Sequence, residues 1–200
     1  NNEVSFLDRE SFAKRIGINI GEKDIFVGII GRHDYVKGHD IFLRAAKIVS
    51  EKYDNVRFLI AGGEGNAELR NLVTELGISD KVVFAGFVDD IYSFINLIDI
   101  NTLTSRSESF PYVLLEGARL KKPTVASAVG GVPDLIEHGK TGLLFENGDY
   151  EGAARQICRL IEDENLRKNL GENLHEKATT RFSSESLAES HIDIYKRILK

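Results

Sequence analysis

The fold of this chain is indicated most clearly by the stretch Asp24-Ile-Phe-Val-Gly-Ile-Ile-Gly-Arg-His-Asp-Tyr-Val-Lys-Gly38. The segment 24–30 is a continuous apolar run of strand length, which is typical of a strand buried on both faces. The segment 31–38 is a polar loop that begins and ends with glycine. Apolar residues at helical spacing then predict an amphipathic helix: Ile41, Phe42, Ala45, Ala46, Val49 and Tyr53.

The same order of strand, loop and helix recurs along the chain. Further strands are predicted at 56–61, 81–85, 98–103, 123–128 and 143–145. Helices are predicted at 8–16, 67–76, 90–97, from Pro111 through Ala118, and over a helical C-terminal part, 150–200, with breaks near Asp163 and Ser183. Such alternation predicts a doubly wound α/β domain, a parallel sheet with helices on both faces. No internal boundary is visible, so we expect residues 1–200 to form a single domain.

Several loops with unusual composition follow the predicted strands. They are 31–38, 62–65, 86–88, 104–112 and 130–134. In a doubly wound sheet, ligands bind outside the carboxyl ends of the strands. We therefore expect these loops to converge on one crevice that binds a small molecule.

Charge and composition exclude several classes of protein. A net charge of -5 and a pI near 5.6 give no support to nucleic-acid binding. No apolar run approaches the ~20 residues that span a bilayer, so no transmembrane segment is expected. The one cysteine, Cys158, excludes an internal disulfide, fits a reducing cytoplasm and lies in an amphipathic run where we expect core packing. Because the chain has no Met, even at position 1, we expect it to be a segment of a larger protein.

Two carboxylates bracket a predicted helix start. Glu108 ends a polar loop, Pro111 suits the first helical turn, and Glu116 lies on the second turn. The free amides and positive dipole of a helix start can hold a phosphate, while flanking acids accept hydrogen bonds from hydroxyl groups. A nucleotide sugar has both kinds of group. The alternative is a pair of solvated helix-end acids.

Two cations occur on the first of these loops. Arg32 has a planar fork that matches phosphate oxygens, and Lys37 is a mobile point charge; Gly31 and Gly38 allow the backbone to approach a ligand closely. We favour diphosphate binding over the alternative of two surface cations, because the other loops are expected at the same place.

Together these motifs resemble the retaining glycosyltransferases of family 4, which have the GT-B fold. The elements that carry the resemblance are, in order, Gly31-Arg32-x4-Lys37-Gly38, Gly62-Gly-Glu-Gly65, Gly86-Phe87-Val88, Glu108-x7-Glu116 and Gly130-Gly-Val-Pro133. The resemblance covers nearly the whole chain. It implies a Rossmann-like, nucleotide-sugar-binding domain, the C-terminal half of such an enzyme, with the N-terminal acceptor-binding half absent from this chain.

The resemblance also implies roles for individual residues. Arg32 and Lys37 would bind the diphosphate and stabilise the leaving group, Glu108 would contact sugar hydroxyls, and these three are the catalytic candidates. The substrate-binding candidates are Gly31, Gly63, Gly65, Phe87, Val88, Ser109, Phe110, Tyr112, Val113 and Glu116. Among them, Glu116 would bind the ribose, and the amides near Tyr112 and Val113 would face phosphate. The sequence departs from the family at Asp134, where relatives have Glu, and at Pro111, where many have Gly.

The activity so implied is transfer of a hexosyl-type sugar from a UDP- or GDP-sugar to a glycan, lipid or small-molecule acceptor, as in polysaccharide biosynthesis. No metal and no other cofactor is expected, because the chain has no Asp-x-Asp and its five His lack metal-ligand spacing. The expected partners are the nucleoside-diphosphate sugar and the acceptor-binding half. The expected location is the cytoplasm, or the inner membrane face through the absent half, and this segment alone should transfer little.

Alternatives from other classes remain at this point. One is a noncatalytic nucleotide-binding module, and another is an NAD-dependent Rossmann enzyme. Gly63-x-Gly65 begins a dinucleotide fingerprint, but Glu68 stands where Gly or Ala should end it. Gly139-Lys140-Thr141 is not a phosphate loop, because Asp134 replaces the required Gly. A third use of two acids is catalysis by a glycosidase, but that function would not explain the two cations or the glycine loops.

Overall fold

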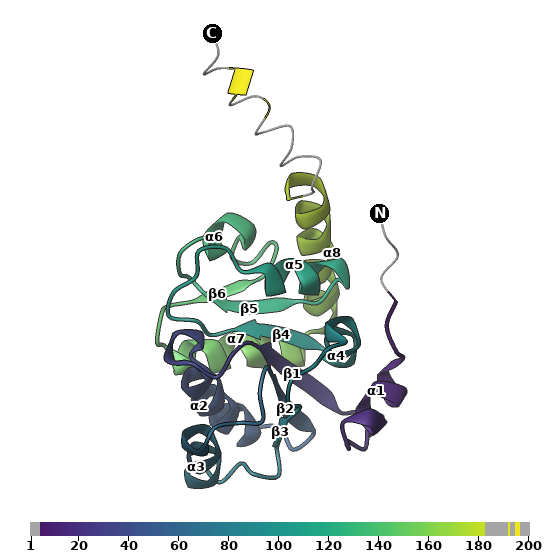
Figure 1. Cartoon of the computed structure of the whole chain (residues 1–200), viewed down its shortest axis with the longest axis vertical. Coiled ribbons are helices and arrows are strands. Elements are labelled where there is room, and N and C mark those ends of the chain that lie inside the picture. Colours follow the sequence, from purple (N-terminus) through teal and green to yellow (C-terminus); the bar gives the residue numbers. More distant parts are fainter. Residues whose placement is uncertain (1–4, 183–191, 193–194, 197–200) are drawn as a thin grey trace.

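All six predicted strands form, and they pair in one parallel sheet. The computed structural model describes residues 5–182, 192, 195 and 196. The strands are β1 (Ile25–Ile30), β2 (Val56–Ala61), β3 (Val82–Phe84), β4 (Ile100–Leu103), β5 (Thr124–Ser127) and β6 (Leu143–Phe145). Their order in the sheet is β3-β2-β1-β4-β5-β6, and every neighbouring pair is parallel (Figure 1). The predicted doubly wound, Rossmann-like fold is confirmed.

The helices connect the strands in the predicted alternation. They are α1 (Arg9–Arg15), the 3-10 turn η1 (Tyr35–Lys37), α2 (His39–Ser50), α3 (Ala67–Glu75), α4 (Ile91–Leu97), α5 (Tyr112–Arg119), α6 (Val132–Leu135), α7 (Tyr150–Glu162) and α8 (Glu164–Arg181). The predicted break near Asp163 is confirmed, since the Asp163 carboxylate caps α8 by accepting a hydrogen bond from the Leu166 amide at 2.8 Å. The break predicted near Ser183 lies outside the described residues.

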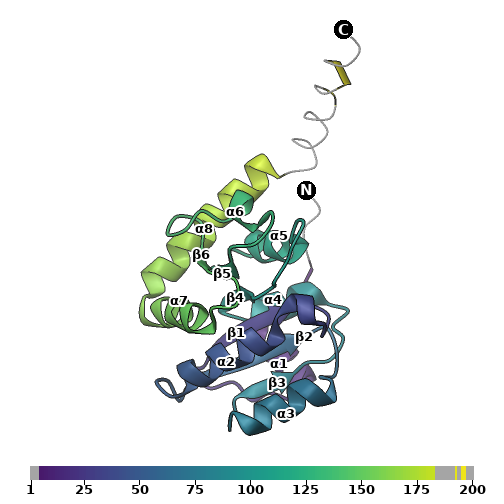
Figure 2. The same cartoon turned by 90° about the vertical axis from the view of Figure 1, so that its left-hand side faces the viewer.

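Helices cover both faces of the sheet. Figure 2 shows α2, α3 and α7 in front of it, where their apolar side chains form one core cluster with the strands. On the other face, α1 and α4 pack over β1 to β3, while α5, α6 and α8 pack over β4 and β5. Cys158 belongs to the first cluster, as predicted, and is 7% exposed.

β1 lies inside the sheet with both faces covered, and this position explains why its sequence is apolar throughout. Val27 and Ile29 point into the cluster under α2, and Phe26 points into the cluster under α1 and α4. Gly28 is required by close packing, because a Cβ there would lie 2.5 Å from the side chain of Ile98. Burial of both faces favours apolar side chains along such a strand.

The strand order reverses between β1 and β4. From β1 the chain builds outward through β2 and β3, then crosses back to β4 and builds outward through β5 and β6. In an open α/β sheet, ligands usually bind at such a reversal, outside the carboxyl ends of the strands. Here the loops after β1 and β4 are 31–38, which contains Lys37, and 104–111, which contains Glu108.

Two local predictions are corrected. Pro111 is the N-cap of α5 and not its first helical residue: proline restricts φ, here -85°, but leaves ψ at 95°, outside the helical range. The segment 130–134 is not a loop throughout, because α6 begins at Val132, with Pro133 in its first turn. Proline is well suited to that position, because the first helical amides have no intrahelical acceptor.

Candidate functional site

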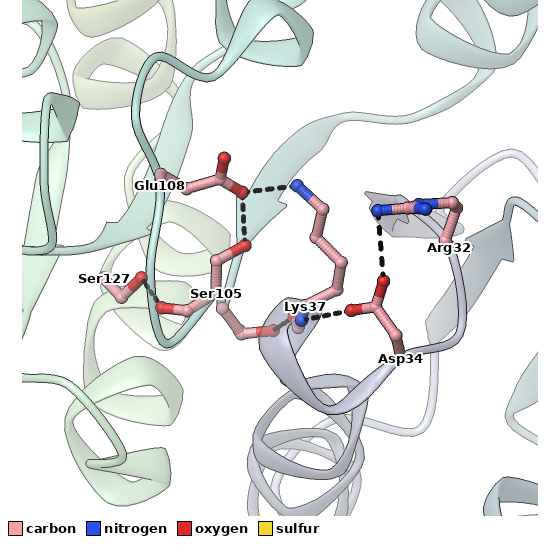
Figure 3. Close-up of polar contacts among 7 residues, drawn as sticks. Arg32, Asp34, Lys37, Ser105, Glu108 and Ser127 are labelled. Atoms are coloured by element: carbon pink, nitrogen blue, oxygen red, sulfur yellow. Dashed lines mark hydrogen bonds and ion pairs between the residues drawn. The ribbon is translucent and has the colours of Figure 1, made fainter.

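Lys37 and Glu108 meet at the reversal point of the sheet. Lys37 Nζ lies 2.6 Å from Glu108 Oε1, and Figure 3 shows the two side chains extending toward each other from the loops after β1 and β4. The Lys37 side chain is 26% exposed and that of Glu108 only 9%. The contact joins two residues that the sequence analysis assigned to different parts of one substrate.

The loop after β1 is built to present Lys37. Asp34 caps η1, accepting a hydrogen bond from the Lys37 amide at 3.1 Å. Gly38 follows with φ 65°, and a Cβ there would lie 2.1 Å from the Thr104 carbonyl oxygen. Thr104 Oγ1 in turn donates to the Gly38 carbonyl at 2.8 Å. The two central loops are therefore in direct backbone contact beneath the Lys37–Glu108 pair.

Two buried serines hold Glu108. Ser105 Oγ donates to Glu108 Oε1 at 2.7 Å, and Ser127 Oγ, at the end of β5, donates to the Ser105 carbonyl at 2.6 Å (Figure 3). The sequence analysis missed both. A serine three residues before an acid is a local signal that could have identified Ser105, whereas Ser127 carries no local signal and is brought near only by the pairing of β4 with β5.

Arg106 adds a second brace between the same loops. Its guanidinium binds the Asp40 carboxylate with two hydrogen bonds, at 2.9 and 2.7 Å, and lies 4.0 Å from the centre of the Tyr35 ring. Its amide donates to the Val36 carbonyl at 2.7 Å. This contact was also missed, and it limits the movement of the loop that carries Lys37.

Arg32 differs from Lys37 in its surroundings. Its side chain is 86% exposed, and its nearest acid is Asp34, at 3.5 Å. Figure 3 shows the guanidinium on the same loop as Lys37, beyond Asp34. Arg32 is thus accessible to an incoming anion without breaking a buried contact.

The glycine loops after β1, β2 and β3 are packed against one another. The amides of Gly62 and Gly63 both donate to the Gly86 carbonyl, at 2.9 and 3.2 Å. A Cβ on Gly62 would lie 2.1 Å from the Gly31 carbonyl oxygen. Gly65 has φ 80°, a conformation that favours glycine. At Gly62, the backbone of the loop after β1 lies too close for any side chain.

The loop after β5 packs on the other side of Glu108. A Cβ on Gly130 would lie 1.6 Å from the Glu108 carbonyl oxygen, and the Gly131 amide donates to that oxygen at 3.3 Å. Contacts therefore connect the ends of β3, β2, β1, β4 and β5 in that spatial order. The predicted convergence of the five loops is present as a continuous edge.

The aromatic candidates are largely exposed. Phe87 is 80% exposed and Tyr112 74%, whereas Val88 is partly buried against the cluster under α1. Phe110 is half-buried, with its ring centre 5.8 Å from that of Tyr112 and 5.5 Å from that of Phe182, at the end of α8. Ser109, one residue earlier, is exposed.

Glu116 lies one turn into α5 and is half-buried. Burial raises the pKa of its carboxyl group, and no hydrogen bond or ion pair joins it to another described residue. At the start of the same helix, the amides of Tyr112 and Val113 have no intrahelical acceptor. This short helix therefore presents an acid that has no partner among the described residues and two amides that have no intrahelical acceptor.

The described residues contain neither a cluster of metal ligands nor a membrane-spanning helix. In 5–182, 192, 195 and 196, no three side chains of His, Cys, Asp or Glu gather where they could hold a metal ion. None of the helices in this part of the chain is long and apolar enough to cross a membrane.

Comparison of sequences shows extensive similarity to known proteins. Residues 10–177 match the family described as glycosyl transferases group 1. The N-acetyl-alpha-D-glucosaminyl L-malate synthase of Bacillus anthracis is 35% identical over 193 residues, 96% of this chain and 50% of that protein. A capsular polysaccharide biosynthesis glycosyltransferase of Staphylococcus aureus is 31% identical over 179 residues, 87% of this chain and 46% of its own. The chain spans about half the length of these curated relatives.

Solved structures agree. HepE of Anabaena, in complex with UDP and glucose, superposes with a TM-score of 0.83 and 26% identity, over 94% of this chain and 52% of HepE. The C-terminal domain of a group 1 family glycosyl transferase from Francisella tularensis superposes with a TM-score of 0.78 and 26% identity, over 91% of this chain and 97% of that domain. This chain therefore belongs to the group 1 glycosyl transferases, and its fold is that of the C-terminal domain of GT-B enzymes.

Proposed function

We propose that this chain is the donor-binding half of a family 4 retaining glycosyltransferase, which transfers a hexosyl-type sugar from a nucleoside-diphosphate sugar. The Lys37–Glu108 contact is the observation that carries this proposal. An acid beside a diphosphate repels it, so a site for phosphate alone would gain nothing from Glu108. An ammonium group next to a shielded carboxylate suits a ligand that has both a diphosphate and hydroxyl groups.

The phosphate end of the donor would be bound by cations and amides. Lys37 and the accessible Arg32 neutralise the diphosphate as it departs, which stabilises the leaving group. The free amides of Tyr112 and Val113 contact a phosphate at the start of α5. These interactions strengthen as negative charge develops on the diphosphate, and that is the requirement for catalysis.

The sugar and nucleoside ends would be bound by the two acids and the neighbouring loops. Glu108 accepts hydrogen bonds from sugar hydroxyls and Glu116 from the ribose. The remaining substrate contacts are proposed at Gly31, Gly63, Gly65, Phe87, Val88, Ser109 and Phe110. The packing of the three glycine loops supports this assignment, because it brings backbone amides and carbonyls to the ligand edge of the sheet.

The relatives support a class of donor and several kinds of acceptor. HepE is described with UDP and glucose, which favours a UDP-sugar here; a GDP-sugar is the second candidate. The names of other relatives refer to L-malate, capsular polysaccharide and lipopolysaccharide core, so a small molecule, a glycan and a lipid-linked acceptor all remain in the proposal, as does polysaccharide biosynthesis.

We further propose that an N-terminal half binds the acceptor, and that residues 1–200 are the donor domain, with 150–200 as its helical C-terminal part. Support comes from the coverage, about half of each relative but nearly all of the isolated C-terminal domain. The single cysteine is consistent with a reducing, cytoplasmic location. Attachment to the inner membrane face, if present, would come from the other half.

The test is a screen of thermal unfolding midpoints with UDP, GDP, ADP, their sugars and NAD. Ligand at 100 times its dissociation constant adds ~2.7 kcal/mol, and each kcal/mol raises the midpoint of a chain of this size by ~2–4 °C. We expect shifts of several degrees with a nucleoside diphosphate and none with NAD. NAD is not favoured, because the glycine loop 62–65 follows β2, whereas a dinucleotide fingerprint follows the first strand.

Two results would contradict the proposal. A flat response to all three diphosphates at millimolar concentration, together with a response to NAD, would make the chain a dinucleotide-binding domain. Binding of a diphosphate with no binding of any of its sugars would favour the noncatalytic module.

A further inference from the structure

We propose that Ser105 is a positioning residue for Glu108, and that it keeps one carboxylate oxygen of Glu108 turned toward the sugar of the donor. The inference rests on the proposed function and adds a residue to it. Ser105 Oγ lies 2.7 Å from Glu108 Oε1, and both Ser105 and its anchor Ser127 are fully buried.

The direction of each hydrogen bond follows from the chemistry of the groups. An ionised carboxylate only accepts, so the Ser105 hydroxyl and the Lys37 ammonium group must both donate to it. Both bind the same oxygen, Oε1. No described residue binds Oε2, and Figure 3 shows that oxygen pointing away from both donors. Glu108 therefore has one oxygen held by the protein and one available to a ligand.

Ser105 is itself fixed from the neighbouring strand. Ser127 Oγ donates to the Ser105 carbonyl at 2.6 Å, from the last residue of β5. Thr104, immediately before Ser105, is bonded to the Gly38 carbonyl at 2.8 Å. The hydroxyl of Ser105 thus projects from a backbone that is held on both sides, and the Glu108 side chain loses rotational freedom before any ligand binds.

Ser105 and Lys37 would behave differently when the donor arrives. Lys37 has a long, flexible side chain and a charge that a diphosphate attracts. As Lys37 turns to the phosphate, its hold on Oε1 weakens. Ser105 is short, buried and uncharged, so a diphosphate does not displace it. Ser105 would then be the contact that keeps Glu108 oriented at the moment when the sugar is bound.

The test compares Ser105→Ala with the wild-type chain in calorimetric titrations with UDP and UDP-glucose, or with GDP and GDP-mannose if the chain prefers guanine. We expect affinity for the nucleotide sugar to fall roughly tenfold, while affinity for the bare diphosphate stays within about twofold, because the hydroxyl acts only through the acid that contacts the sugar. The matched control is Ser107→Ala, which removes a hydroxyl from an exposed position of the same loop and should change neither affinity.

A double-mutant cycle separates positioning from a general structural role. In a Glu108→Ala background, Ser105→Ala should cause no further loss of nucleotide-sugar affinity, because the group that it orients is gone. Ser127→Ala, which frees the Ser105 backbone, should lower nucleotide-sugar affinity in the same direction by a smaller factor. If Ser105→Ala does not fold, the titrations of Ser127→Ala test the positioning role in its place.

The outcomes distinguish this inference from the proposed function. Equal loss of both ligands in Ser105→Ala, no loss of either, or a further loss in the Glu108→Ala background would overturn the inference alone, provided that wild-type protein binds the donor and Glu108→Ala weakens it. Absence of any nucleotide binding by the wild-type chain would overturn the proposed function and this inference with it.

Discussion

Lys37 and Glu108 are separated by 71 positions in the sequence and by 2.6 Å in the molecule. Because the Glu108 side chain is almost shielded from water, Lys37 stabilises its charge, and removal of Lys37 would leave a nearly buried carboxylate without a cation. The two residues therefore cannot be changed independently. A loss of diphosphate affinity in Lys37→Ala would include the disturbance of Glu108 as well as the lost phosphate contact.

Substitution of Glu108 and substitution of Glu116 should have different effects on ligand binding. Glu116→Ala should weaken binding of UDP, GDP or ADP by ~1–3 kcal/mol, because we assign its carboxylate to the ribose. Glu108→Ala should lower affinity for the sugar-bearing donor but leave that for the bare diphosphate unchanged or slightly higher, because it releases Lys37. Titration of both variants with a diphosphate and its sugar measures this. Exchanged behaviour, or equal loss of both ligands in both variants, would show that the assignment is wrong.

At the scale of elements, α8 packs against α5 and the turn that follows it. A Cβ on Gly171 of α8 would lie 2.0 Å from the carbonyl oxygen of Lys121, in the turn between α5 and β5. Lys121 has φ 54°, which is uncommon for a residue other than glycine. The far end of α8 approaches the site loop, where Phe182 packs on Phe110. The helix that presents the proposed phosphate amides is thus held by a helix distant in sequence.

Gly171→Ala tests this close contact by the sign of its effect. Helix propensity alone would make the variant more stable by ~1 kcal/mol. The collision with the Lys121 backbone should outweigh that gain and lower the free energy of unfolding by ~1–3 kcal/mol, measured by urea denaturation. The control is Glu172→Ala, at the next, exposed position, where loss of a 3.9 Å ion pair should change stability by less than about 0.5 kcal/mol. An increase in stability for Gly171→Ala would contradict the packing described.

At the scale of the whole molecule, the order of the strands assembles the site. Parallel strands have all their carboxyl ends at one edge, and the strand order reverses between β1 and β4, where open α/β sheets usually bind ligands. Sequence distance is unimportant in this arrangement. The ends of β3 and β5 are separated along the chain by α4, β4 and α5, yet both contribute to one edge.

The stability of the molecule should depend on pH through a buried histidine. His39 is 2% exposed, and its ring centre lies 4.8 Å from that of His33. Burial and the neighbouring His33, despite Asp34 and Asp40, lower the pKa of His39 to about 4 from an ordinary value of 6.5. Between these values the unfolded chain binds a proton that the folded chain does not, so stability falls as pH falls.

The expected size of this effect is ~2 kcal/mol of unfolding free energy lost between about pH 7 and pH 5. His39→Leu removes the titrating group and should flatten the dependence over this range. Urea unfolding of both proteins at several pH values measures it. The same steepness in wild type and variant would exclude His39 as the cause.

Local patterns in the sequence determined the elements. Continuous apolar runs of strand length, amphipathic helices and glycine or acidic caps are short-range signals, and each predicted strand formed within a few residues of its expected bounds. The alternation of the elements determined the fold class, because few arrangements bury both faces of a parallel sheet. The helix start at Pro111 was misjudged because it depended on ψ, which proline does not restrict.

Only the tertiary structure decided which side chains meet. The sequence identified Lys37 and Glu108 as candidates, but their contact depends on β1 and β4 being neighbours in the sheet. The residues of a strand do not indicate which strand will pair with it in parallel. The role of Ser127 could not be predicted for the same reason, since its hydroxyl contacts Ser105 only because β4 pairs with β5. Likewise, Glu116 is half-buried and has no partner among the described residues because of what packs around α5. Short-range propensities are encoded residue by residue, whereas burial and long-range contacts arise only once helices cover both faces of the whole sheet.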